Sequence, residues 1–163
     1  MPEVFLSIGS NIDPETHIPA AITELSDLFG PLIVSSTYET AAVGFEGPPF
    51  HNLVAAFDSE RNPKEIARLL RELEERHGRT RHSQKFSSRT LDVDLIQYGS
   101  AILDDKDFRL PRDEITRYAF VLEPLAEIAP EHRHPINGKT YRELWNAFDK
   151  SALVQKKLTS PIK

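Results

Sequence analysis

The sequence predicts an α+β fold, a ferredoxin-like βαββαβ sandwich with C-terminal additions. Short stretches rich in β-branched and aromatic residues alternate with longer stretches whose apolar residues recur at helical spacing. Clusters of Gly and Pro separate these stretches. The length of 163 residues is enough for one domain with a hydrophobic core. We expect this domain over residues 1–150 and a basic tail over residues 151–163.

The first half of the pattern contains two strands and a helix. Residues 3–9 are predicted to form a strand because Val and Phe are enriched there and a Gly ends the run. Residues 16–29 are predicted to form a helix that the following Gly-Pro pair terminates. The apolar positions at helical spacing are Ile18, Ala21, Ile22, Leu25, Leu28 and Phe29. Residues 32–38 indicate a second strand, and the Gly- and Pro-rich residues 40–49 indicate a loop.

The second half repeats the pattern with a strand, a helix and a strand. Residues 50–57 are predicted to form the third strand. Asn62 has the character of an N-cap, and Pro63 suits the first helical position. The helix is expected to end at residues 77–78, where a Gly follows a His. Its apolar stripe consists of Ile66, Leu69, Leu70 and Leu73. Residues 90–98 then form the fourth predicted strand.

Further elements follow this unit. We expect a turn at residues 103–105, an apolar stretch over residues 118–128 and a last helix over residues 140–148. The tail from Ser151 carries three lysines and no acidic residue. We expect this tail to be loosely ordered.

Composition narrows the classes of function. The net charge of −5 and a pI of about 5.7 argue against a surface that binds nucleic acid throughout. The absence of Cys excludes disulfides, thiolate catalysis and zinc–thiolate sites. The N-terminus lacks a basic and apolar leader, and no stretch approaches the ~18 apolar residues of a membrane span. We therefore expect a cytoplasmic protein without a membrane partner.

Two carboxylates in the fourth predicted strand are candidate metal ligands. Asp92 and Asp94 alternate with apolar residues, so both should lie on one face of the strand, with Cα atoms about 7 Å apart. The apolar side should pack on the helices, which leaves both aspartates on the open face of the sheet. Paired carboxylates together with substrate phosphates are a common way to hold magnesium. The alternative is a pair of solvated charges on an exposed sheet face.

A basic run precedes the acidic pair. Residues 76–89 contain no acidic side chain, and Arg79, Arg81 and Arg89 bracket a segment without periodicity that is predicted to be a loop. Arginines on a loop can close over phosphates and neutralise their charge, whereas a solvated basic loop is the alternative. Glu74, at the edge of the helical stripe, is either an orienting acceptor for an arginine or a surface glutamate.

The third predicted strand carries a candidate ligand for a heterocycle. Asn52 shares a face with Phe50, and a carboxamide presents a donor beside an acceptor, which matches an amide-like heterocycle edge. Aromatic rings can stack on the faces of such a heterocycle. An ordinary hydrogen-bonded Asn is the alternative.

Several short blocks of this sequence, taken together, resemble the 6-hydroxymethyl-7,8-dihydropterin pyrophosphokinase family. Members of that family move a pyrophosphoryl group from ATP to a pterin alcohol in the folate pathway. The matching blocks are Leu6–Asn11, Tyr38–Gly44, Phe50–Asn52, Leu73–Arg81, Arg89–Asp94 and Phe120–Pro130. Arg-Thr-Leu-Asp-Val-Asp, preceded by Gly-Arg-Thr-Arg, is the most specific of them. The resemblance covers nearly the whole chain.

The resemblance implies a complete set of site residues. Asp92 and Asp94 would bind two Mg²⁺ ions that bridge the phosphates of ATP, the co-substrate. The residues implied to contact the nucleotide are Glu74, Arg79, Arg81, Arg89, Leu95, Arg112 and Tyr118; those implied in catalysis are Arg79, Arg89, Asp92 and Asp94. The residues implied to hold the pterin are Thr40, Val43, Phe50, Asn52 and Phe120, with Thr40 and Val43 offering backbone groups and the two Phe rings stacking.

Two positions depart from the family pattern. Arg112 stands where the family usually has a histidine that reaches the nucleotide, and Tyr118 stands where it usually has an arginine. A guanidinium at Arg112 can still donate to phosphate, whereas Tyr118 removes one from the site. Arg117, next to it in the sequence, or Arg112 could take the place of that guanidinium in space.

The expected partners are therefore the pterin and ATP, for a monomeric enzyme that binds no nucleic acid. Three alternatives stay open at this level: a family paralogue that acts on a related pterin or is catalytically weakened, a βαββαβ RNA-recognition module, and a nuclease built on the Asp-x-Asp pair. The acidic charge and the lack of a basic–aromatic pattern in the third strand argue against the RNA module. A nuclease would need further acidic ligands.

Overall fold

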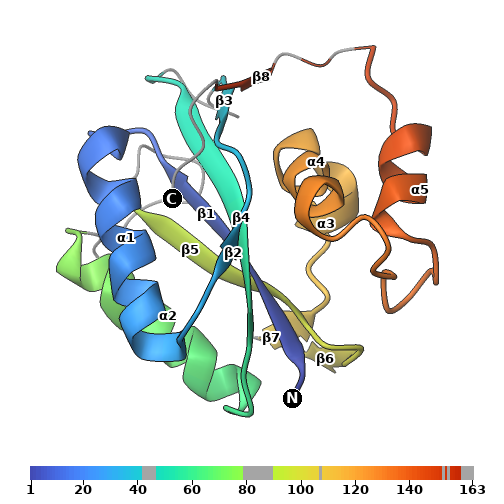
Figure 1. Cartoon of the computed structure of the whole chain (residues 1–163), viewed down its shortest axis with the longest axis horizontal. Helices are drawn as coiled ribbons and strands as arrows, with labels where there is room; N and C mark the ends of the chain where they lie inside the picture. Colours follow the sequence, from blue (N-terminus) through green and yellow to red (C-terminus); the bar gives the residue numbers. More distant parts are fainter. Residues whose placement is uncertain (42–46, 79–89, 107, 152, 154, 159–163) are drawn as a thin grey trace.

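A six-stranded antiparallel sheet forms the centre of the computed structural model, which describes residues 1–41, 47–78, 90–106, 108–151, 153 and 155–158 (Figure 1). The strands in spatial order are β5 (Asp92–Tyr98), β1 (Glu3–Ser10), β4 (Phe50–Asp58), β3 (Tyr38–Thr40) and β8 (Lys156–Lys157), with β2 (Ile33–Val34) also paired with β4. Without β8, this is the strand order of a βαββαβ unit, so the predicted fold class is confirmed.

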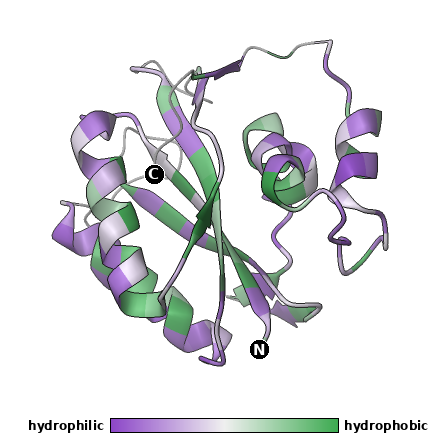
Figure 2. Cartoon of the chain, in the orientation of Figure 1, coloured by the Kyte–Doolittle hydropathy of each residue, from purple (hydrophilic) through white to green (hydrophobic). Residues whose placement is uncertain are grey.

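Two helices cover one face of the sheet. They are α1 (Pro14–Phe29) and α2 (Pro63–Arg76), which lie together on the left in Figure 1. Between these helices and the sheet lies a buried cluster that includes Leu6, Leu53 and Leu70. Figure 2 shows apolar residues on the sides of both helices that face the strands. Most of the apolar positions predicted from the sequence belong to this cluster or pack against it, namely Ile18, Ala21, Ile22, Leu25, Phe29, Ile66, Leu70 and Leu73. The exceptions are Leu28 and Leu69, which are only partly buried and lie outside the cluster.

The second face of the sheet is partly covered, which corrects the expectation of an open face. Helices α3 (Glu114–Arg117), α4 (Ala119–Ile128) and α5 (Tyr141–Ala147) form a third layer on that side (Figure 1). A second buried cluster joins Val54 and Ile96 of the sheet to Leu122, Leu125 and Tyr141 of this layer. The apolar stretch at residues 118–128 thus closes one part of the face that also carries the acidic pair.

Local sequence signals set the ends of the helices. The Asn62 side chain accepts from the backbone N–H of Lys64 at 2.8 Å, and Pro63 occupies the first turn of α2, as predicted. Thr140 and Glu143 form a reciprocal capping box at the start of α5. Helix α1 begins at Pro14, two residues before the predicted start, because Pro is also suited to the first turn of a helix.

Three regions differ from the prediction. The expected turn at residues 103–105 is strand β6 (Leu103–Asp105), which pairs with β7 (Phe108–Leu110). The expected strand at residues 32–38 divides into β2 and β3, because Ser35 bonds Val54 through its backbone N–H and its hydroxyl and interrupts the regular ladder. The expected loose tail contains β8, which pairs with β3. Among the described residues, no helix is long and apolar enough to cross a membrane.

Candidate active site

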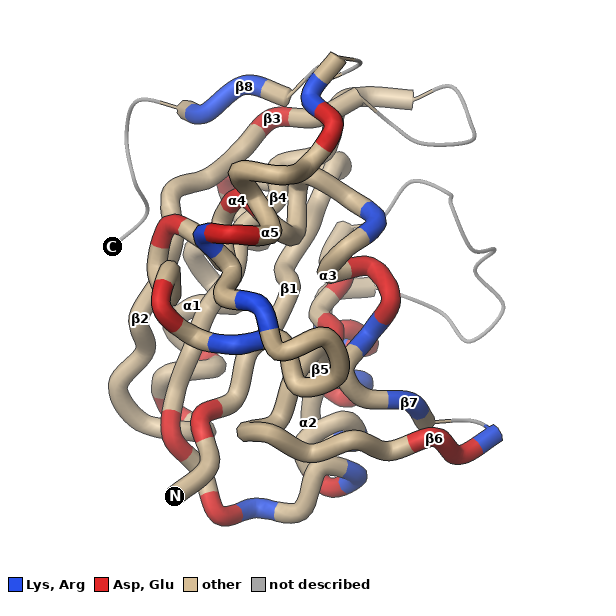
Figure 3. Tube along the Cα trace, turned by 90° about the vertical axis from the view of Figure 1, so that its right-hand side faces the viewer, with Lys and Arg blue, Asp and Glu red and all other residues tan. Residues whose placement is uncertain are grey.

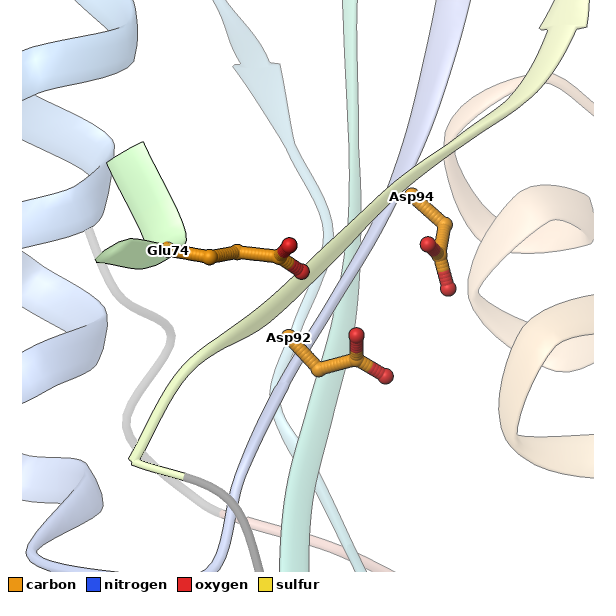
Figure 4. A group of neighbouring side chains, drawn as sticks. All are labelled: Glu74, Asp92 and Asp94. Atoms are coloured by element: carbon orange, nitrogen blue, oxygen red, sulfur yellow. The ribbon is translucent and has the colours of Figure 1, made fainter. Parts of the chain in front are cut away.

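The acidic pair lies on β5 with the predicted alternation. Leu91, Val93 and Leu95 are buried in the cluster under α1 and α2. Asp92 and Asp94 are partly exposed and project on the side of the strand away from α2 (Figure 4). The prediction that both carboxylates share one face is therefore confirmed.

Glu74 brings a third carboxylate to this position from α2. One carboxylate oxygen from each of Glu74, Asp92 and Asp94 lies within 4.8 Å of the other two (Figure 4). Glu74 is buried, and its Oε2 accepts the backbone N–H of Val93 at 2.8 Å. The surface alternative for Glu74 is thus wrong. In the described sheet β5 is an edge strand, paired only with β1. The Glu74 carboxylate therefore lies against the unpaired edge of β5, at the backbone N–H of the residue between the two aspartates.

Arg112 stands beside the acidic group. Its backbone N–H donates to the carbonyl of Ile96 at 2.9 Å, and its Nη2 donates to Glu114 Oε2 at 2.8 Å. Burial acts to lower the pKa of Arg112, but the hydrogen bond and charge of Glu114, together with the charges of Asp94 and Asp92, outweigh burial and raise that pKa. A guanidinium therefore lies within electrostatic reach of both aspartates.

One row of residues across the sheet joins the acidic pair to the predicted heterocycle ligand. Asp92 is paired with Gly9, Gly9 with Asn52, and Asn52 with Tyr38. Paired residues of antiparallel strands point to the same face, so the Asp92 and Asn52 side chains lie on one face with Gly9 between them. Asn52 is buried, and its Nδ2 donates to Thr40 Oγ1 at 2.8 Å.

Gly9 was predicted from the sequence to end a strand within the block Leu6–Asn11, and not to be a site residue. A Cβ atom at this position would lie 2.7 Å from Asn52 Oδ1 and 3.7 Å from Phe50 Cδ1. The missing side chain thus allows the Asn52 amide and the Phe50 ring to lie over the backbone of β1. A Gly in a strand is one sequence signal for such a close approach.

The predicted aromatic residues come from two layers. Phe50 begins β4, and Phe120 lies in the first turn of α4. The Phe120 ring stacks on the Tyr118 ring, with centroids 5.0 Å apart and planes 17° apart. Both rings pack against the second buried cluster. Tyr118 thus supports the Phe120 ring in this structure.

The structure does not describe four of the predicted site residues, and it buries the side chain of a fifth. Arg79, Arg81, Arg89 and Val43 lie outside the described residues. The Leu95 side chain is buried on the helix-covered face opposite the acidic pair, so a contact from Leu95 to a nucleotide would come from its backbone.

The model of the family 7,8-dihydro-6-hydroxymethylpterin-pyrophosphokinase (HPPK) matches residues 5–130. The chain belongs to this family. An HPPK relative from Synechocystis sp., named 2-amino-4-hydroxy-6-hydroxymethyldihydropteridine pyrophosphokinase, is 34% identical over 151 residues, which cover 91% of this chain and 77% of the relative. A Pseudomonas aeruginosa protein with the same name is 33% identical over 149 residues, which cover 86% of this chain and 88% of that protein.

Solved structures agree with this assignment at the level of the fold. A Plasmodium falciparum HPPK-DHPS triple mutant has a TM-score of 0.74 at 14% identity and is matched over 89% of this chain and 41% of its own. An HPPK-DHPS in complex with substrates has a TM-score of 0.75 at 12% identity, and the match covers 96% of this chain and 47% of that chain. The chain thus spans less than half of those solved chains. The comparisons confirm the resemblance seen in the sequence and the expected enzyme class, a pyrophosphokinase.

Proposed function

We propose that this HPPK-family chain transfers the pyrophosphoryl group of ATP to the hydroxymethyl group of 6-hydroxymethyl-7,8-dihydropterin and releases AMP, in folate biosynthesis. The observation that carries the proposal is the row in which the Asp92 carboxylate and the Asn52 amide share one face across Gly9. A metal-bound phosphate chain and a heterocycle can thus be held side by side on a rigid sheet.

The acidic group fits magnesium. Asp92 and Asp94 offer hard oxygen ligands on one face, which is the donor type that Mg²⁺ takes together with substrate phosphates. Glu74 Oε2 accepts the Val93 N–H, so its role in the proposal is to orient the segment between the two aspartates. Bound Mg²⁺ would neutralise charge on the phosphate oxygens and lower the pKa of a coordinated hydroxyl.

The cationic residues would hold the nucleotide. Arg112 is fixed by Glu114 beside the aspartates and is available to donate to a phosphate oxygen. Arg79, Arg81 and Arg89 are assigned to the phosphates from the family resemblance. Oriented guanidinium groups would stabilise the charge that develops on the leaving phosphate, and positioning would supply most of the acceleration.

The pterin would lie against the residues at the other end of the row. Asn52 is oriented by Thr40, so its Oδ1 and the remaining Nδ2 proton are the groups available for an amide-like edge. Phe50 and Phe120 would stack on the ring system from β4 and from α4. In this arrangement the hydroxymethyl group would point along the row toward Asp92.

Chromatographic detection of AMP tests the proposal. Purified protein with Mg-ATP and 6-hydroxymethyl-7,8-dihydropterin should release AMP and pterin diphosphate. Asp92→Ala and Asp94→Ala should each lower kcat by at least about 100-fold and weaken Mn²⁺ binding measured by electron paramagnetic resonance. The matched control is Asp104→Ala, which removes an exposed carboxylate from β6. Release of ADP, or full activity in both aspartate variants, would contradict the proposal.

The RNA-recognition alternative is disfavoured by the third layer. Such modules stack bases on an exposed sheet face, whereas Val54 and Ile96 of this face are buried beneath α4 and α5. The catalytically weakened paralogue is distinguished by the same AMP measurement, because it would bind the pterin without releasing AMP.

A further inference from the structure

The proposed pterin ligands belong to two separate layers of the fold. Thr40 and Asn52 are hydrogen-bonded to each other on neighbouring strands of the sheet. Phe120 belongs to α4 in the third layer. Holding a heterocycle requires both sides at a fixed separation, so contacts that fix α4 against β3 determine the geometry of this site.

The carboxy-terminal strap, residues 155–158, contacts α4. Gln155 Nε2 donates to the carbonyl oxygen of Ala119 at 3.2 Å and to Glu123 Oε1 at 2.6 Å. Ala119 is the residue immediately before Phe120. One amide of the strap is therefore bonded to the first turn of the helix that carries the stacking ring.

The same strap is paired with the sheet. Lys156 and Lys157 pair with Glu39 and Tyr38 of β3, and the backbone N–H of Leu158 donates to the carbonyl oxygen of Thr37 at 2.9 Å. Figure 1 shows the chain returning from α5 to this edge of the sheet, and Figure 3 shows the basic pair of β8 beside β3. The strap thus spans from the first turn of α4 to the strand that ends at Thr40.

A second tie holds the other end of α4. The Glu127 carboxylate accepts from the backbone N–H and the hydroxyl of Ser36, both at 2.9 Å, and from the Tyr38 hydroxyl at 2.6 Å. Burial acts to raise the pKa of Glu127, but these hydrogen bonds, together with the charge of Lys157, outweigh burial and lower the pKa. Lys157 of the strap also lies 3.9 Å from Glu127 Oε1, an ion pair that is lost with the strap. Because Glu127 keeps its hydrogen bonds to Ser36 and Tyr38, loss of the strap should release the end with Phe120 without detaching α4.

We infer that residues 155–158 are a positioning element for pterin binding, with Gln155 as the residue that fixes the first turn of α4. This inference rests on the proposed function. The strap lies beyond residues 5–130, which the family model matches, so it extends the site with residues outside that match. The tail then acts on the pterin site through the position of α4.

Steady-state kinetics on three variants test the inference. A chain that ends at Ser151 lacks the strap, and Gln155→Ala removes its bonds to α4. The matched control is Lys150→Ala, since Lys150 bonds the carbonyl oxygens of Trp145 and Phe148 at the end of α5. We expect KM for the pterin to rise about tenfold in the shortened chain, equivalent to about 1.4 kcal/mol, and severalfold in Gln155→Ala. KM for ATP and kcat should stay within about twofold, and the control should match the parent.

A distance measurement gives a readout that does not depend on turnover. The chain contains no Cys, so spin labels can be placed at Asp58→Cys on β4 and Thr116→Cys on α3 without removing native thiols. Both positions are exposed. Pulsed electron paramagnetic resonance should give a broader distance distribution when the strap is removed, because the start of α4 is then held less tightly.

The outcomes separate the two proposals. An unchanged pterin KM with an unchanged distance distribution would overturn the positioning role, even if the shortened chain unfolds at a lower temperature. A full-length chain that releases no AMP from ATP and the pterin would instead refute the proposed function, and the distance measurement would still report whether the strap fixes α4.

Discussion

The substitution Gly9→Ala is expected to weaken pterin binding through Asn52. A methyl group at this position would lie 2.7 Å from Asn52 Oδ1, whereas ordinary contacts begin at 3.4 Å. The amide must therefore retreat by about 0.7 Å or more. Thr40 Oγ1 holds the same amide at 2.8 Å, so this retreat strains or breaks that hydrogen bond.

The size of the effect follows from the geometry. A displacement of about 1 Å in a positioned group can cost about 100-fold in rate, and a lost hydrogen bond contributes about 0.5–1.5 kcal/mol. We expect KM for the pterin to rise about 10- to 100-fold in Gly9→Ala, with KM for ATP nearly unchanged. Extended backbone accepts Ala, so the loss of stability should come from the Asn52 contact alone.

A double-mutant cycle with Asn52→Ala provides the test. The pterin dissociation constant is measured by fluorescence for the parent, both single variants and the double variant. If Gly9 acts through Asn52, adding Gly9→Ala to Asn52→Ala should change the dissociation constant little, so the two effects are strongly non-additive. Normal pterin affinity in Gly9→Ala, or additive effects in the cycle, would refute the reasoning.

Three further predictions concern single side chains. Glu74→Ala leaves the buried Val93 N–H without its acceptor, so the free energy of unfolding should fall by about 1–3 kcal/mol in urea titrations, whereas Glu74→Gln, which keeps an acceptor, should lose less. Arg112→Met removes a partly exposed positive charge beside the aspartates, so it should weaken ATP binding but tighten Mn²⁺ binding in the absence of nucleotide by up to about fivefold. Calorimetry that shows both affinities changing in the same direction would contradict this. Burial lowers the pKa of His134 in the folded protein. As the pH falls below about 6.5, His134 therefore takes up a proton in the unfolded chain before it does so in the folded protein, and the folded protein loses stability until the pH reaches its own lower pKa. Urea midpoints at pH 7 and pH 5 should therefore differ less in His134→Asn than in the parent.

The sequence predicts the parts of this fold that depend on neighbours along the chain. The Asn62–Pro63 start of α2 follows from the preferences of those two residues, and the alternation around Asp92 and Asp94 places both on one face. These features need only local periodicity and capping. They are sufficient to identify the acidic pair as a candidate site.

Features that depend on contacts between distant segments could not be predicted in this way. The apolar residues 118–128 indicate a buried segment, but not that it covers the second face of the sheet. The close approach of Asn52 to Gly9 depends on strand pairing between residues that are 43 positions apart, and the pairing of β8 with β3 joins residues still more distant. The tail contains no periodic pattern that would have indicated its partner.

The row from Asp92 through Gly9 to Asn52 fixes the distance between the proposed metal ligand and the proposed pterin ligand. Asp92 and Asn52 stand on strands separated by β1, and each step between neighbouring strands is about 4.8 Å, so their backbones are about 10 Å apart. This span is set by main-chain hydrogen bonds, which side-chain substitutions do not lengthen. An enzyme of this design that adapts to a bulkier acceptor would therefore have to change its helices or loops and keep the strands as they are.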